Sequence, residues 1–175
     1  MRVAFLSGPG GVGKTTVGGQ VLRLLPDHWV FFEVDRCQPT ISPNPRFATI
    51  ENERRMTRAN LEAARCYVTA GFPTLVEMDV VDERRRRVRE EVFRGIPALV
   101  IVLTARHDVA MQRIRERGTD IRWLAAFEAT YEAVAWEHDS ATATIDTSDR
   151  SPEQVAAEVA ELIDAWTEVR ATIHH

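Results

Sequence analysis

Lysine is almost absent from this chain. The 22 lysine and arginine residues include a single lysine, Lys14. Guanine-specific GTPases read their base with an N-K-x-D motif, and the chain holds no second lysine that could form one. No aspartate is followed three positions later by glycine, so the D-x-x-G switch motif is missing as well. These two absences argue against a GTPase switch.

The chain also has few cysteines, no long apolar run and no excess of positive charge. Cys37 and Cys66 are the two cysteines and have no C-x-x-C spacing, which favours a reduced, cytoplasmic setting. No apolar run reaches membrane-spanning length, and the opening MRVAFLSG is too short and too soon glycine-rich for a secretory signal. A net charge of −4 argues against a protein that binds nucleic acids or membrane surfaces in general. We therefore expect one soluble domain over residues 1–175.

Strand-like and helix-like apolar patterns alternate along the chain. The patterns predict strands at residues 3–6, 29–32, 74–76, 98–103 and 143–145. They predict helices at residues 14–25, 51–70, 83–93, 107–117, 122–137 and from a capping box at Ser151 toward residue 169. Several of the strands are apolar throughout, which is typical of a parallel sheet covered on both faces. The expected fold is therefore α/β, with three layers and a five-stranded parallel sheet between helices.

One helix carries an apolar stripe that predicts its buried face. In the helix at 51–70 the stripe consists of Met56, Ala59, Ala63, Cys66 and Ala70, and Gly71 is the expected residue just beyond its end.

The stretch SGPGGVGKTT at residues 7–16 lies between the first predicted strand and the first predicted helix. It contains the pattern G-x-x-x-x-G-K-[ST] in full. Glycines let successive backbone N–H groups point at phosphate oxygens, and the helix start adds its positive dipole end. Lys14 is a compact cation that bridges the β- and γ-phosphates, a slot too narrow for a planar guanidinium, and the Thr15 hydroxyl is the expected Mg²⁺ ligand. The predicted ATP-binding residues of this loop are Gly8, Pro9, Gly10, Gly11, Val12, Gly13, Lys14, Thr15 and Thr16.

Three further motifs follow this loop. VFFEVD at residues 30–35 places an acid at the end of the second strand, and Arg113 and Arg117 stand four apart before Gly118. IDTS at residues 145–148 precedes the Ser151 capping box. Large AAA and transporter ATPases need a longer chain and usually a clear hydrophobic run ending in an acid, for which LVEMD at residues 75–79 is a short, ambiguous candidate.

With the loop, these motifs resemble the P-loop nucleoside/nucleotide-kinase-like superfamily, which includes adenylate, shikimate and gluconate kinases and small antibiotic-modifying phosphotransferases. The resemblance extends over nearly the whole chain, with the P-loop as its specific signature. LVEMDVV at residues 75–81 is similar, more weakly, to the tunicamycin-resistance-like ATP-binding proteins.

The resemblance implies a role for each motif. Asp35 faces the acceptor hydroxyl and orients or deprotonates it, while strand alternation puts Glu33 on the same side as a rival. Arg113 and Arg117 supply cations over the transferred γ-phosphoryl group, and a short lid follows at about residues 118–122 with Arg122. A surface salt bridge to the nearby Glu116 or Asp120 is the alternative interpretation of any one of these three arginines. Asp146 and Ser148 belong to the loop that flanks the adenine, so they join Arg117 as predicted ATP-binding residues.

The acceptor is expected to bind mainly at about residues 36–58. The predicted acceptor-binding residues are Glu33, Asp35, Arg36, Arg54, Arg58, Glu77 and Asp79. A solvated surface is an equally good interpretation of Arg36, Arg54 and Arg58. The charge run at residues 82–91 is interpreted as an exposed, salt-bridged helix face.

The expected activity is ATP- and Mg²⁺-dependent transfer of a γ-phosphoryl group to a hydroxyl of a small molecule. The acceptor loop at residues 36–50 is short and holds three prolines, so it lacks the longer helical arm of a nucleoside-monophosphate kinase. A sugar-, nucleoside- or antibiotic-like acceptor is therefore favoured. A nucleoside-monophosphate kinase, a polynucleotide 5′-kinase, and a non-catalytic ATP-binding resistance protein that sequesters a ligand remain as alternatives. The expected partners are ATP and the acceptor, without membrane or nucleic acid, in a monomer or homodimer.

Overall fold

The structure is a computed structural model, and it describes residues 2–25, 28–37, 49–79, 83–118, 124, 127, 128, 131 and 141–173. The proline-rich acceptor loop, most of the helix expected at 122–137, and the lid beyond Gly118 with Arg122 lie outside the described residues. None of the helices within the described ranges is long and apolar enough to cross a membrane.

A five-stranded parallel sheet forms the centre of the described chain. Its strands are β1 (Val3–Gly8), β2 (Val30–Glu33), β3 (Thr74–Asp79), β4 (Ala98–Thr104) and β5 (Ala143–Asp146). They lie in the order β2-β3-β1-β4-β5, and every neighbouring pair is parallel. The central position of β1 places the loop after Gly8 at the middle of the sheet's carboxyl edge, where the strand order reverses and α/β proteins bind ligands.

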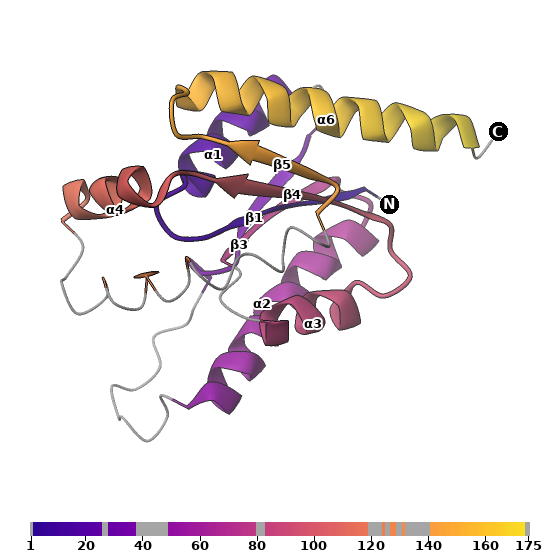
Figure 1. The fold of residues 1–175 in the computed structure, drawn as a ribbon. Helices are drawn as coiled ribbons and strands as arrows, with labels where there is room; N and C mark the ends of the chain where they lie inside the picture. Colours follow the sequence, from indigo (N-terminus) through magenta and orange to yellow (C-terminus); the bar gives the residue numbers. More distant parts are fainter. Residues whose placement is uncertain are drawn as a thin grey trace.

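Helices cover both faces of this sheet (Figure 1). They are α1 (Lys14–Leu24), α2 (Ile50–Thr69), α3 (Glu83–Val92), α4 (His107–Glu116) and α6 (Pro152–Ile173). α1 and α6 lie on one face and α2 and α3 on the other, while α4 lies beyond the end of β4. The predicted three-layer α/β fold with a five-stranded parallel sheet is confirmed.

The two faces of the sheet bury two separate apolar clusters. Along β1, Ala4 and Leu6 pack in the cluster that includes residues of α1 and α6. Val3 and Phe5, which alternate with them, pack in the cluster that includes residues of α2 and α3. Since both faces are buried, the strands are apolar without interruption, which is the pattern that the sequence shows.

The predicted buried face of α2 is wrong. Ala59, Ala63 and Cys66 of the predicted stripe are exposed. The buried residues of this helix are Thr57, Asn60, Leu61, Ala64 and Val68. The true face includes the bulky Leu61 and also the polar Asn60, whose amide donates a 2.9 Å hydrogen bond to the Val34 carbonyl. The expected helix end is confirmed, since Gly71 follows with φ of 96°.

The charge run on α3 forms only part of an exposed face. Arg86 pairs with Glu83 and Glu90, and Arg87 pairs with Glu83, as the spacing predicts. Arg89, in contrast, is only 3% exposed, and its guanidinium lies 5.4 Å from the centre of the Phe5 ring. The prediction of an exposed face is wrong for Arg89, because the helix turns that side chain onto the sheet.

The second strand does not reach Asp35, the acid expected at its end. β2 stops at Glu33, and residues 34–37 form a turn closed by a 3.2 Å hydrogen bond from the Cys37 N–H to the Glu33 carbonyl. Asp35 therefore lies in the turn and not in the strand. Strand alternation therefore does not place Glu33 and Asp35 on the same side, and that prediction is wrong.

Candidate active site

The loop between β1 and α1 follows the path that the sequence predicts. Gly8 has φ of 139°, and a Cβ there would lie 2.2 Å from the Leu103 carbonyl oxygen. Gly11 has φ of 82°, and a Cβ there would lie 2.4 Å from the Ala110 carbonyl oxygen. Both positions require glycine, because the backbones of β4 and α4 come too close for a side chain.

The Lys14 side chain folds back onto this loop. Its ammonium group donates a 2.9 Å hydrogen bond to the Pro9 carbonyl and forms an ion pair with Asp79 at the end of β3. The side chain is only 5% exposed. The sole lysine of the chain thus lies inside the loop, at the start of α1, where a phosphate-binding cation is expected.

Thr15, the predicted Mg²⁺ ligand, lies next to a carboxylate. Its hydroxyl donates a 3.1 Å hydrogen bond to Oε1 of Glu77 on β3. Because the hydroxyl is the donor, its oxygen lone pairs stay available to a cation. Mg²⁺ prefers oxygen ligands of this kind, so the residues present fit the predicted ion.

A cavity of about 190 Å³ brings the loop together with several predicted residues. Its lining includes Lys14, Thr15, Asp35, Glu77, Asp79 and Arg117. These side chains come from α1, the turn after β2, β3 and the end of α4. The cavity therefore joins the predicted phosphate-binding cation to the predicted acceptor-orienting carboxylate.

Two carboxyl groups that line this cavity, Asp35 and Glu77, have a raised pKa. Burial raises the pKa of Asp35, and the charge of Asp79 raises it further, while Arg85 and Lys14 oppose the rise. Burial also raises the pKa of Glu77, which Lys14 lowers in part. A carboxyl group with a raised pKa is a suitable proton acceptor for a hydroxyl near neutral pH.

Arg85 on α3 was not predicted as a site residue. Its Nη1 lies 3.6 Å from Oδ1 of Asp35 and donates a 3.2 Å hydrogen bond to the Asp79 carbonyl. Its Nη2 donates a 2.5 Å hydrogen bond to Oε1 of Glu53 on α2. The side chain is 14% exposed, so the exposed-face interpretation is wrong for Arg85 as well. Its spacing from the buried Val88 and Val92 was the available signal.

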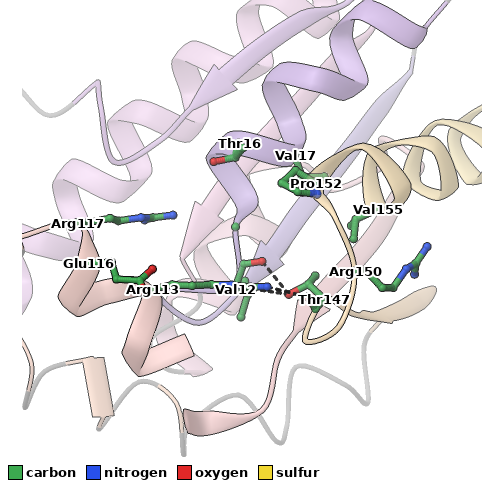
Figure 2. A pocket seen from close by; sticks show the side chains of 11 residues that line it. Val12, Thr16, Val17, Arg113, Glu116, Arg117, Thr147, Arg150, Pro152 and Val155 are labelled. Atoms are coloured by element: carbon green, nitrogen blue, oxygen red, sulfur yellow. Dashed lines mark hydrogen bonds between the residues drawn. The ribbon is translucent and has the colours of Figure 1, made fainter. Parts of the chain in front are cut away.

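A second cavity, of about 340 Å³, is lined by residues of the loop, α1, α4 and α6. Figure 2 shows its lining, to which Val12 and Thr16 contribute from the loop and α1, and Pro152 and Val155 from α6. Arg117 lines this cavity as well as the first one. Its position between the two cavities fits a cation that contacts the phosphates of a nucleotide.

Arg113 is directed at the loop after β5 (Figure 2). Its Nη1 donates a 3.0 Å hydrogen bond to the Thr147 hydroxyl, and its Nη2 donates a 2.8 Å hydrogen bond to the Thr147 carbonyl. Arg113 lines the larger cavity and is not among the residues that line the smaller one. Its predicted role over the γ-phosphoryl group stays a prediction.

Thr147 links this loop to the phosphate-binding loop. Its hydroxyl is within 3.1 Å of the Val12 carbonyl oxygen and 3.0 Å of the Thr104 carbonyl oxygen. The residues predicted from the sequence are instead its neighbours Asp146 and Ser148. The Ser148 backbone N–H and hydroxyl both donate to Oδ1 of Asp146, at 2.9 and 2.6 Å, and neither residue is in the lining of either cavity.

The remaining predicted acceptor residues lie outside both cavities. Arg36 is 74% exposed and donates a 3.3 Å hydrogen bond to Oε2 of Glu33. Arg58 pairs with Glu91, and Arg54 is exposed on α2. Their predicted contacts with the acceptor stay predictions.

Together, the sheet order, the loop geometry and the two cavities define a P-loop nucleotide-binding domain of the kinase-like type. The chain belongs to the family described as AAA domain, whose model matches residues 3–144.

Solved structures with the same fold include three informative neighbours. A sugar kinase from Janibacter sp. HTCC2649 is 22% identical, with a TM-score of 0.72 over 94% of this chain and 95% of that chain. A gluconokinase from Sinorhizobium meliloti 1021 is 18% identical, with a TM-score of 0.73 over 99% and 98%. The tunicamycin resistance protein of Deinococcus radiodurans is 19% identical, with a TM-score of 0.66 over 94% and 96%. A comparison with curated protein sequences gives no match.

Proposed function

We propose that this protein is an ATP- and Mg²⁺-dependent kinase that transfers the γ-phosphoryl group to a hydroxyl of a small molecule. The observation that carries the proposal is the 190 Å³ cavity, in which Asp35 lies together with Lys14 and Thr15. One side of this cavity suits a triphosphate, and the other offers a carboxylate to an acceptor hydroxyl.

Each side chain has a role in the transfer. Lys14 and Arg117 neutralise the charge on the phosphoryl oxygens, and Asp35 orients the acceptor hydroxyl and takes its proton. The acceptor oxygen forms its bond to the γ-phosphorus as the bond from that phosphorus to the β,γ-bridging oxygen breaks, and the electron pair leaves with ADP. When bound, Mg²⁺ supplies further charge neutralisation at the phosphates, and Thr15 would hold it.

A sugar-, nucleoside- or antibiotic-like acceptor fits this site best. The small volume of the cavity suits a small molecule. The neighbours described as a sugar kinase and a gluconokinase share the fold over nearly the whole chain, which supports the same class of acceptor.

The charge pairing around α3 argues against a polynucleotide 5′-kinase. Such an enzyme needs free cations along an acceptor channel. Arg58 is paired with Glu91, and Arg86 and Arg87 are paired with glutamates of their own helix. These pairs reduce the positive potential that a nucleic-acid backbone would require.

The experiment is a phosphoryl-transfer assay with γ-labelled ATP, Mg²⁺ and a panel of acceptors. The panel holds hexoses and sugar acids, nucleosides, amino-sugar antibiotics, nucleoside monophosphates and a 5′-hydroxyl oligonucleotide. Labelled product from a member of the first three classes supports the proposal. Labelling of nucleoside monophosphates alone, or of the oligonucleotide alone, would refute it. Tight binding of ATP and a ligand without turnover would instead indicate a sequestering protein, as the likeness to a tunicamycin resistance protein allows.

A further inference from the structure

Arg85 connects four elements next to Asp35, which lines the cavity of about 190 Å³, called the acceptor cavity from here on. It lies on α3, and its guanidinium reaches Asp35 in the turn after β2, the Asp79 carbonyl at the end of β3, and Glu53 on α2. With 14% of the side chain exposed, the guanidinium is largely withdrawn from water. This is the geometry of a fixed cation between packed elements and not that of a surface arginine.

The two terminal nitrogens of the Arg85 guanidinium contact different carboxylates. Nη1 faces Oδ1 of Asp35 at 3.6 Å, while Nη2 is held by Oε1 of Glu53 at 2.5 Å. Glu53 thereby fixes the orientation of the fork, and the fork faces Asp35. A lysine ammonium is a single point charge and lacks two separate nitrogens for these two tasks.

Asp35 meets charges of both signs from several elements. The charge of Asp79 on β3 works against the ionised form of Asp35, and Glu77 lines the same cavity. Lys14 on α1 favours the ionised form, but its ammonium is already paired with Asp79. Arg85 is a second cation that favours the ionised form, and it acts from outside the cavity lining, to which Arg117 at the end of α4 also contributes.

We propose that Arg85 is a positioning residue that, anchored by Glu53, holds the Asp35 carboxylate in its ionised form and directs it at the acceptor hydroxyl. This inference rests on the proposed kinase function. Arg85 does not touch the reacting atoms, so its effect reaches the reaction through Asp35.

The first test compares steady-state kinetics across pH for the wild type, Arg85→Gln, Arg85→Lys and Arg87→Gln. Arg87 is the matched control, because it lies on the same helix, is 64% exposed and pairs with Glu83. Arg85→Gln is expected to lower kcat on the order of 10²-fold with little change in the KM for ATP, because a misaligned group near the reaction costs about that much.

The pH profile separates positioning from a general loss of structure. Without the cation, ionised Asp35 is less stable, so the low-pH limb of kcat is expected to move up by about 1 pH unit in Arg85→Gln. Arg85→Lys keeps the charge, so its limb should stay near that of the wild type while kcat falls. Arg87→Gln should match the wild type in both respects. An Arg85→Gln enzyme with an unchanged kcat or an unmoved limb would overturn the proposal.

A second measurement needs no turnover. The titration of the Asp35 carboxyl carbon is followed by ¹³C NMR in the wild type, Arg85→Gln and Arg87→Gln, with folding checked by backbone amide spectra. Asp35 is expected to titrate at higher pH in Arg85→Gln than in the other two. If Asp35 titrates at the same pH in all three proteins, the role of Arg85 is refuted. If the wild type has no kinase activity but Asp35 titrates at higher pH in Arg85→Gln, only the kinase function is refuted.

Discussion

Lys14 and Asp79 form an ion pair across the start of α1 and the end of β3, and Lys14 is only 5% exposed. The same ammonium group donates to the Pro9 carbonyl, so the loop and β3 hold one cation between them. In a chain that otherwise uses arginine, this narrow and buried position explains why a lysine is present.

Replacement of Lys14 by arginine should therefore fail as completely as replacement by alanine. Both Lys14→Arg and Lys14→Ala are expected to lower turnover on the order of 10²–10³-fold, since alanine removes the fixed charge at the reacting phosphate and the broad, planar guanidinium of arginine cannot place its charge there. The measurement is kcat together with the melting temperature, because either change also alters the pairing of Asp79. A Lys14→Arg enzyme with nearly normal kcat would show that the position does not require a compact cation.

Asp35→Asn is expected to lower kcat on the order of 10²–10⁴-fold, because an amide cannot accept the proton of the acceptor hydroxyl. Asp35 lines the acceptor cavity, whereas Glu33 lies outside it. Parallel kinetics of Glu33→Gln and Asp79→Asn test the two rival bases. A larger loss of kcat in either rival than in Asp35→Asn would move the role of base to that residue.

The elements that the sequence predicted well are those with strong local patterns. The order of strands and helices follows from uninterrupted apolar runs and from the glycines after them, and the loop that holds Lys14 has a specific motif. The capping box is also confirmed, since Ser151 and Gln154 exchange hydrogen bonds of 3.0 and 3.3 Å. Each of these features depends on residues close together in the chain.

The sequence did not predict the features that depend on contacts between residues far apart in the chain. Arg85 resembles its exposed neighbours in a run of four arginines, and only the packing of α3 beside α2 and the sheet shows that it faces Asp35. Thr147 stands between two equally polar residues, and its role depends on carbonyl groups 135 and 43 positions away. The buried face of α2 was also missed, because two stripes have helical spacing and only the sheet decides between them.

Thr147→Val is expected to weaken ATP binding and to destabilise the fold. Valine keeps the shape but removes the hydroxyl that contacts the Val12 carbonyl and accepts from Arg113. Loss of one partner of a buried hydrogen bond costs about 1–3 kcal/mol. Calorimetric titration with ATP and chemical unfolding measure the two effects. Ser148→Ala provides the comparison, and a greater loss of ATP affinity there would favour the predicted contact of Ser148 with the adenine.

Glu77→Gln is expected to stabilise the protein at neutral pH. Burial raises the pKa of folded Glu77 above that of the unfolded chain, so its contribution to stability is full in acid and is lost as the pH rises through the folded pKa. Glutamine carries no charge and can still accept the Thr15 hydrogen bond. The melting temperature of Glu77→Gln should exceed that of the wild type at pH 7–8, and the difference should shrink toward acid. Glu161→Gln, at an exposed position on α6, is the control. A difference in melting temperature that grows in acid would show that burial does not raise the pKa of Glu77.

Two adjacent glycines of α1 should respond in opposite ways to alanine. A Cβ at Gly19 meets no atom within 4 Å, so Gly19→Ala is expected to stabilise the helix by about 0.5–1 kcal/mol. A Cβ at Gly18 would lie 2.4 Å from Cζ of Phe31 on β2, and the Phe31 ring is packed against the core between α1 and the sheet. Gly18→Ala is therefore expected to destabilise the fold by about 1–3 kcal/mol, the usual cost of overpacking. Urea unfolding of both variants measures the free-energy changes, and stabilisation by Gly18→Ala would show that Phe31 moves aside without cost.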